Sequence, residues 1–266
     1  MPYTVSHAAA VLPLKNSGLP LAALMIGSMS PDFAYFLPEP LSRTTTHSLA
    51  GIFSFCLPVG LLAWQFFVRI LERPTLELLP EAWRDRLPRS ERGLSLRAIT
   101  LAALAVIIGA ATHIVWDAFT HANTFVTHVL ASLRIEAFTL GGRPVHVYFI
   151  LQVLSSVVGL VALGAWAWNL RRRPVCSPAG HGTRASLSGR VRLTALVAML
   201  TTSGTTSVAY YAIYSDSLLE HRIFQFLIGG MLGWLLAWSV IAVLVSRMLR
   251  SETALPANAR PLLKRR

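Results

Sequence analysis

Five long apolar stretches constrain the fold of this 266-residue chain more than any other feature of its sequence. They cover residues 49–68, 99–119, 147–168, 193–213 and 223–246. A helix of about 20 residues crosses a hydrocarbon core of about 30 Å, and only segments that pair their own backbone groups are stable in lipid. The stretches therefore predict an all-α, polytopic membrane helix bundle with about five transmembrane helices.

A sixth apolar segment, residues 19–29, is too short to cross a membrane. Pro20 and Pro31 lie at its two ends, and proline limits the extent of a helix. We expect a short helix that lies at the membrane interface or re-enters the bundle. A simple packing helix is the alternative interpretation.

The composition agrees with a membrane protein. Hydrophobic residues make up 54% of the chain and charged residues only 14%, which argues against a disordered chain and against an ordinary soluble domain. Two cysteines, Cys56 and Cys176, are too few for a disulfide framework. No basic segment precedes the first apolar stretch, so we do not expect a cleavable signal peptide.

The distribution of basic residues predicts the orientation of the helices. The chain has 24 Lys and Arg against 12 Asp and Glu, a formal net charge of +12. Fifteen basic residues lie in two loops, residues 71–96 and 171–190, and in the tail after Met248, whereas five lie on the opposite side. Because basic residues near the ends of spans are retained in the cytoplasm, we expect the C-terminus inside and the N-terminus outside. We treat residues 1–250 as a single membrane domain and residues 251–266 as a flexible basic cytoplasmic tail.

Ionisable residues inside one predicted span form the first candidate site. His113, Asp117 and His121 repeat every four residues, so they lie along one face of the helix near its outer end. Ionisable groups within membrane spans are costly and usually functional. A His and an Asp one turn apart can bind one metal ion, although a buried His–Asp hydrogen bond that only joins two helices is the alternative.

Further residues of the same types are predicted at the same end of the bundle. His7 lies near the N-terminus, Asp32 follows the short apolar segment, and His47 directly precedes the first span. Each histidine alone is more often a capping or core residue than a ligand. Together, three imidazoles and two carboxylates suit a divalent ion such as Zn²⁺.

Four segments of the chain, residues 1–14, 27–33, 46–51 and 109–121, resemble a family of bacterial integral-membrane proteins classed only as a domain of unknown function. The order of the motifs is a His, then Pro-Asp, then Thr-His-Ser, then His-x-x-x-Asp-x-x-Thr. This order is also similar to that of YdjM-type inner-membrane proteins, described as predicted metal-dependent hydrolases, and more distantly to zinc-dependent phospholipase C. The resemblance implies a bacterial inner-membrane location and a metal-binding set that consists of His7, Asp32, His47, His113 and Asp117.

The resemblance also implies that Thr120 and His121 lie beside the metal ligands or face the substrate. Residues 147–153 depart from the pattern, because we expect a histidine after Gln152 in relatives. This chain either lacks that contact or supplies it from His128 or His146.

These observations favour a metal-dependent hydrolase at the extracytoplasmic membrane surface. A bound divalent ion, zinc by its ligand set, would activate water, and an unligated carboxylate or His121 would act as the base. The candidate catalytic residues are His121 and Asp117. Arg134 or Arg143 would hold an anionic headgroup. The expected substrate is a lipid-linked or envelope molecule, such as a phosphoester.

Two other functions stay open at this stage. A permease is one, because Thr and Ser residues at positions 201–207 could line a hydrated path, although such hydroxyls more often join helices. The Gly229-x-x-x-Gly233 spacing likewise indicates close helix packing. A structural membrane protein held together by its metal, without catalysis, is the other. Nucleic-acid binding is not expected, since topology already explains the basic loops.

Overall fold

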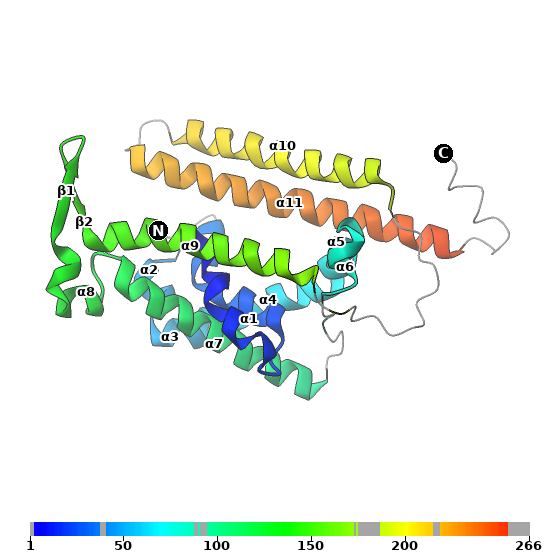
Figure 1. Ribbon diagram of the computed structural model, residues 1–266, viewed down its shortest axis with the longest axis horizontal. Coiled ribbons are helices and arrows are strands. Elements are labelled where there is room, and N and C mark those ends of the chain that lie inside the picture. Colours follow the sequence, from blue (N-terminus) through cyan, green and yellow to red (C-terminus); the bar gives the residue numbers. More distant parts are fainter. Residues whose placement is uncertain are drawn as a thin grey trace. The chain divides into compact units, whose positions relative to one another are not determined.

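The computed structural model describes residues 3–37, 41–87, 90, 95–172, 174, 187–214 and 219–254. The described chain is almost entirely helical, which confirms the all-α prediction (Figure 1). Its internal contacts divide it into two compact units. Unit 1 comprises Met1–Gln65 and Ser90–Pro174, and unit 2 comprises Phe66–Arg89 and Val175–Arg266. Cys176, most of the 171–190 loop and residues 255–266 of the predicted tail lie outside the described residues.

Four of the five predicted spans are found as long apolar helices. Among the described residues, the segments long and apolar enough to cross a membrane are Leu49–Leu78, Leu96–Val129, Val147–Leu170 and His221–Leu249. The remaining stretch, residues 193–213, lies within helix α10 (Gly189–Ile213), whose Thr and Ser residues make it less apolar than these four. By length and composition, the chain can therefore cross a membrane.

Unit 1 contains the N-terminal segment and two of the long helices. In chain order its elements are η1 (Thr4–Asn16), α1 (Leu21–Met29), η2 (Ser30–Phe36), α2 (Arg43–Thr46), α3 (Leu49–Gly51), η3 (Ile52–Cys56), α4 (Leu57–Phe66, whose last residue belongs to unit 2), α7 (Leu96–Thr120), α8 (Phe125–Val129), η5 (Ala131–Arg134), β1 (Glu136–Leu140), β2 (Arg143–His146) and α9 (Val147–Leu170).

Helix α1 is the short apolar helix expected at residues 19–29, and it packs closely against α7. A Cβ atom added at Gly27 would lie 2.5 Å from the Val106 carbonyl oxygen, and one at Gly109 would lie 2.5 Å from the Ser28 nitrogen. Glycine at both positions lets the two backbones touch. Helix α1 is therefore built into the bundle of unit 1, and it fixes the backbone of residue 28 against the middle of α7.

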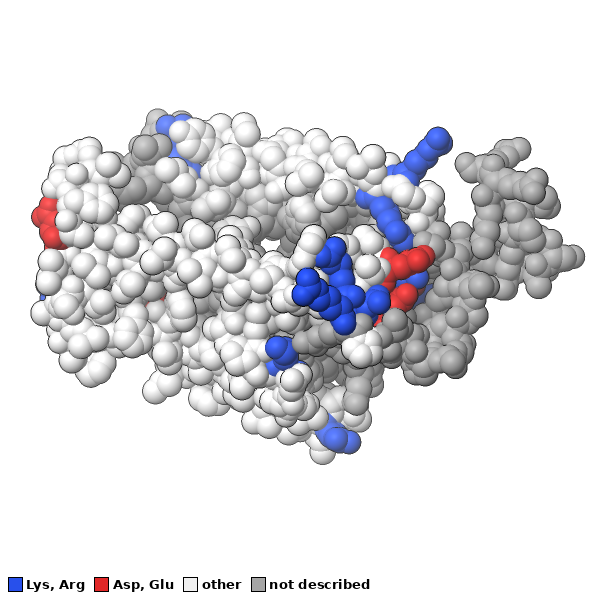
Figure 2. Space-filling view, viewed as in Figure 1, with Lys and Arg blue, Asp and Glu red and all other residues white. Residues whose placement is uncertain are grey.

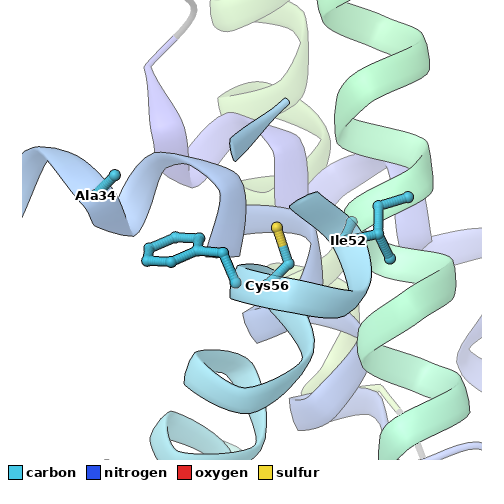
Figure 3. Close-up of a cluster of buried hydrophobic side chains, with 5 residues drawn as sticks. Ala34, Ile52 and Cys56 are labelled. Atoms are coloured by element: carbon cyan, nitrogen blue, oxygen red, sulfur yellow. The ribbon is translucent and has the colours of Figure 1, made fainter. Parts of the chain in front are cut away.

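A small apolar cluster packs beside these helices. Figure 3 shows Ala34 of η2 with Ile52 and Cys56 of η3, and the cluster also contains Phe55 and Ala110. Cys56 is a buried free thiol that donates a hydrogen bond to the Thr46 carbonyl oxygen at 3.6 Å. This cluster holds η2 and the start of the first long helix against α7.

A β-hairpin connects the two long helices of unit 1, α7 and α9, along the chain. Strands β1 and β2 pair antiparallel through the turn residues Gly141 and Gly142, whose φ angles are +58° and +79°. A two-residue turn with positive φ at both positions is the type that matches the twist of paired strands, and glycine adopts it without strain. The hairpin leads directly into α9, and the hydrogen bond from Val147 N–H to the Ile135 carbonyl oxygen, at 3.1 Å, joins the start of that helix to the residue before β1.

Unit 2 is built mainly from two long helices packed side by side, α10 and α11 (Leu219–Ala254) (Figure 1). A Cβ atom added at Gly229 would lie 2.6 Å from the Thr206 carbonyl oxygen, and Gly233 also faces Thr206. The Gly-x-x-x-Gly spacing thus permits the close packing that it predicts. The shorter elements of unit 2 are η4 (Phe67–Leu71), α5 (Glu72–Leu78) and α6 (Glu81–Arg84).

Large apolar side chains remain exposed along the long helices. On α9, Leu154, Val157 and Val161 are all more than half exposed. Most of the described surface seen in Figure 2 carries neither acidic nor basic side chains. Lipid can cover such a surface without loss of hydrogen bonds, which agrees with a membrane-spanning bundle.

Candidate metal centre

All five residues predicted to bind metal come together inside unit 1. They arrive from four separate elements, η1, η2, the end of α2 and α7, and each side chain is at least 94% buried. We call this group the His/Asp cluster, and its members are His7, Asp32, His47, His113 and Asp117.

Helix α7 supplies His113 and Asp117 one turn apart, with His113 Nε2 at 3.5 Å from Asp117 Oδ2. His113 Nδ1 lies 2.7 Å from the carbonyl oxygen of Ser28, which can only accept a hydrogen bond. The proton therefore resides on Nδ1, and Nε2 faces the cluster with its lone pair. A histidine held in this way by a backbone carbonyl is the usual arrangement of a metal ligand.

His47 is positioned by a break between two short helices. Ser42 caps α2 by accepting a hydrogen bond from Thr45 N–H, and Ser48 caps α3 by accepting one from Gly51 N–H. The chain therefore turns at His47, between the end of α2 and the cap of α3. His47 Nδ1 lies 3.0 Å from the Thr46 hydroxyl. Its Nε2 points inward, 3.2 Å from the Nε2 atom of His113.

The two carboxylates approach these imidazoles from different sides. His47 Nε2 is 3.4 Å from Asp32 Oδ1 and 3.4 Å from Asp117 Oδ2. The Thr4 hydroxyl donates to Asp32 Oδ2 at 2.7 Å, which leaves Oδ1 facing the imidazoles. Burial alone would raise the pKa of Asp32, but its imidazole neighbours and the Thr4 hydroxyl hold that pKa below its ordinary value, so the group is a carboxylate.

His7 closes the cluster from the N-terminal segment. Its ring stacks on that of His113, with centroids 3.8 Å apart, and its Nε2 lies 3.6 Å from Asp117 Oδ1. Burial and then the adjacent His113 imidazole lower the pKa of His7 to about 3. His7 is therefore neutral near pH 7, which is the form that binds metals.

Several ligand-type atoms of the cluster have no hydrogen-bond partner among the described residues. They are the Nε2 atom of His7, the Oδ1 atom of Asp32 and the Oδ1 atom of Asp117, and all three are buried. A buried polar atom without a partner is costly, and an ion is one recognised explanation for it. The ligand atoms of His7, Asp32 and His113 lie within 4.8 Å of one another, as do those of His47, His113 and Asp117. The cluster can hold a metal ion.

The residues expected beside the ligands also lie at the cluster. His121 Nδ1 is 3.6 Å from Asp117 Oδ2 and 3.3 Å from the Thr120 hydroxyl. The Nε2 atom of His121 is buried, and no described residue gives it a hydrogen-bond partner. Thr120 itself is buried at the end of α7.

Arg43 is a member of the site that sequence reasoning missed. Its Nη2 donates to Asp117 Oδ2 at 2.6 Å. The available signal was its spacing, because Arg43 precedes His47 by four residues and one helical turn brings such a pair to the same face. For Thr4 and Ser28, which hold Asp32 and His113, the sequence carries no comparable signal.

The other proposed contacts lie elsewhere in the described structure. Arg134 and Arg143 are exposed residues of η5 and β2. His128 is exposed on α8, and His146 stacks on Tyr148 with ring centroids 5.3 Å apart. Arg43 is a basic residue in direct contact with the site.

The chain belongs to a family described as "Domain of unknown function (DUF4184)", whose sequence model matches residues 1–246. No match was found among curated proteins or among solved structures. The membership covers every residue of the His/Asp cluster. The similarity to YdjM-type proteins and to zinc-dependent phospholipase C stays a prediction.

Proposed function

We propose that this protein is a membrane-embedded, metal-dependent hydrolase whose metal centre is the His/Asp cluster. The observation that carries the proposal is a set of buried ligand-type atoms that have no hydrogen-bond partner among the described residues, and that come from elements far apart in the chain and face one another. A fold that needed only helix contacts would gain more from apolar side chains there, because buried charges stabilise poorly unless they are fully paired.

The donor set favours zinc. Imidazole nitrogens with carboxylate oxygens suit Zn²⁺ and similar transition metals, whereas Mg²⁺ and Ca²⁺ prefer all-oxygen sites. When bound, such an ion would lower the pKa of a water molecule towards about 7 and polarise an acyl or phosphoryl oxygen.

His121 and Asp117 have separate roles in this proposal. Asp117 orients the Arg43 guanidinium group and three imidazoles, because its Oδ2 atom accepts a hydrogen bond from Arg43 and lies near all three rings. Among the described residues, the hydrogen-bonding neighbours of the His121 ring, the Asp117 carbonyl oxygen and the Thr120 hydroxyl, lie at Nδ1, so Nε2 can accept a proton. His121 is therefore the proposed general base.

We further propose a location in a bacterial cytoplasmic membrane, with the N-terminus outside and the C-terminus in the cytoplasm. The uneven distribution of basic residues supports this orientation. It requires α10 to span the membrane, and several α10 hydroxyls are compatible with lipid because they bond to backbone oxygens. The Ser203 hydroxyl donates to Gly230 O at 2.8 Å, and the Thr206 hydroxyl to Thr202 O at 2.8 Å.

Metal analysis of the detergent-purified protein tests the proposal. We expect bound zinc in the wild type and its loss in His47→Ala and His113→Ala, with His128→Ala as a matched control at an exposed histidine. Hydrolysis of model phosphoesters and carboxyl esters should disappear in His121→Ala while the metal remains. Metal content and activity that survive His113→Ala would refute the proposal.

A reporter inserted at the Gly141–Gly142 turn tests the orientation separately. An alkaline phosphatase fusion should be active there, because the turn is expected outside the cytoplasm. Activity of a cytoplasmic reporter at the same position would contradict the proposed topology.

A structural metal is the second candidate, because the cluster is almost fully buried and closed structural sites are typical of zinc. The two functions differ in the expected hydrolysis: a catalytic site predicts activity that His121→Ala removes. A purely structural site predicts no hydrolysis in the wild type, and it predicts that loss of metal abolishes folding itself.

A further inference from the structure

We infer that Arg43 forms an anion-binding site beside the metal centre, so that the substrate carries negative charge at or next to the reacting group, as a phosphate ester does. This inference rests on the proposed function and names its substrate class. It assigns the anion contact to Arg43 rather than to Arg134 or Arg143.

Exposure is the first observation. The Arg43 side chain is 31% exposed, whereas the His47 side chain is 6% exposed and that of Asp117 only 3%. Among the described charged residues in contact with the cluster, Arg43 is thus the one that reaches solvent. A molecule that approaches the metal ligands along this side meets the guanidinium group before it meets them.

The second observation is hydrogen-bonding capacity. The Nη2 atom donates to Asp117 Oδ2 at 2.6 Å and the guanidinium group also donates to the Tyr35 hydroxyl, so among the described residues these two bonds leave further N–H donors of the five for a ligand. The Nε atom is buried and has no hydrogen-bond partner among the described residues. A planar guanidinium group can donate in parallel to two oxygens of a phosphate, and such charge-assisted pairs are among the strongest in proteins.

Charge balance is the third observation. With neutral imidazoles, the carboxylates of Asp32 and Asp117 and the Arg43 cation leave one net negative charge at the site. One divalent ion reverses this to one net positive charge. Without Arg43, the same loaded site would be neutral. Arg43 is therefore the residue that makes the metal-loaded centre attract an anion in a buried environment of low dielectric constant.

Arg43 could instead serve only to orient Asp117, and phosphate binding separates the two roles. The experiment uses full-length protein in detergent loaded with Co²⁺, a paramagnetic substitute for Zn²⁺. Broadening of the ³¹P resonance of inorganic phosphate then reports binding only to metal-loaded molecules. The variants are Arg43→Gln and, as a matched control, Arg134→Gln, which changes an exposed arginine of the same unit.

We expect Arg43→Gln to weaken phosphate binding by about 10- to 100-fold, because it removes charge-assisted hydrogen bonds, and we expect Arg134→Gln to have no effect. An Arg43→Gln protein that binds phosphate as tightly as the wild type, per metal-loaded molecule, would overturn the inference. Arg43→Lys should be intermediate, since it keeps the charge but loses the planar fork.

Parallel titrations with short-chain phosphatidic acid and phosphatidylcholine identify the source of the anion. Tighter binding of phosphatidic acid than of inorganic phosphate would indicate a lipid phosphate, and equal binding would indicate a soluble one. A wild type that binds no metal would refute the proposed function. A metal-loaded wild type whose phosphate affinity does not depend on Arg43 would refute this inference alone.

Discussion

Replacement of Asp117 by Asn tests the metal centre most directly. The substitution keeps the shape of the side chain but removes one negative charge and replaces one oxygen ligand with an NH₂ group. Asp117 Oδ2 lies 3.4 Å from His47 Nε2 and 3.5 Å from His113 Nε2, so its charge acts on the position that a shared ion would occupy. We expect Asp117→Asn to weaken metal binding strongly.

The magnitude follows from two estimates. Two unit charges 4 Å apart interact by about 4 kcal/mol at an effective dielectric constant of about 20. Loss of a residue that only supports a ligand from outside weakens metal binding by about 10- to 100-fold. Because Asp117 is a buried member of the cluster, its replacement should weaken metal binding by more than a supporting residue does, and by nearly as much as the interaction of the two charges. We therefore expect about 100- to 1000-fold weaker binding, or about 3–4 kcal/mol.

Competition with a fluorescent zinc chelator measures this change in detergent-purified protein. Asp85→Asn is the matched control, because Asp85 is a partly exposed acid of unit 2 that pairs with Arg84 at 3.0 Å. The control should bind zinc as the wild type does. If Asp117→Asn also retained wild-type zinc affinity while remaining folded, the assignment of Asp117 to the metal centre would be wrong.

Three further predictions follow from the same structure. Chelation of the metal should lower the thermal unfolding temperature of the wild type, because an ion present at about 1000 times its Kd stabilises the folded state by about 4 kcal/mol, and calorimetry with and without chelator would detect this. In metal-free protein, the free energy of unfolding should rise with pH between about 3 and 6.5, because His7 binds a proton in the unfolded chain but not in the folded one. His7→Gln should reduce this slope by up to about 1.4 kcal/mol per pH unit, which thermal melts at several pH values would measure. Gly109→Ala should destabilise unit 1 by about 1–3 kcal/mol in thermal unfolding, because its Cβ would lie 2.5 Å from the Ser28 nitrogen, whereas Gly164→Ala, with no neighbour within 4 Å, should be neutral or stabilising.

The long helices could be predicted because each apolar stretch is a local property of the sequence. The spacing of His113, Asp117 and His121 is local as well, since one helical period decides which residues share a face. The approach of His7 and Asp32 could be expected only from the predicted topology and the family resemblance. The distances that join them depend on α1, whose close contact with α7 brings the Ser28 carbonyl oxygen to His113.

Other features depend on contacts that a single sequence does not display. Gly141 and Gly142 set the type of the turn in the hairpin. The pairing of its strands is not evident from an alternating apolar pattern, because β1 is exposed throughout. In the sequence Arg43 is one of the five basic residues on the side opposite the basic loops, and its contact with Asp117 depends on the helix α2 that Ser42 caps.

The geometry of His113 bears on how many ions the centre can bind. Both groups of potential ligands, His7 with Asp32 and His47 with Asp117, include His113 as the third member. His113 has one nitrogen to offer, because its Nδ1 atom donates to the Ser28 carbonyl oxygen at 2.7 Å. A single imidazole nitrogen binds one ion, so the two groups cannot both be filled through His113. The structure therefore favours one ion per chain, bound by ligands drawn from both groups, and elemental analysis should give a zinc-to-protein ratio near one; a ratio near two would require the second ion to be bound without His113.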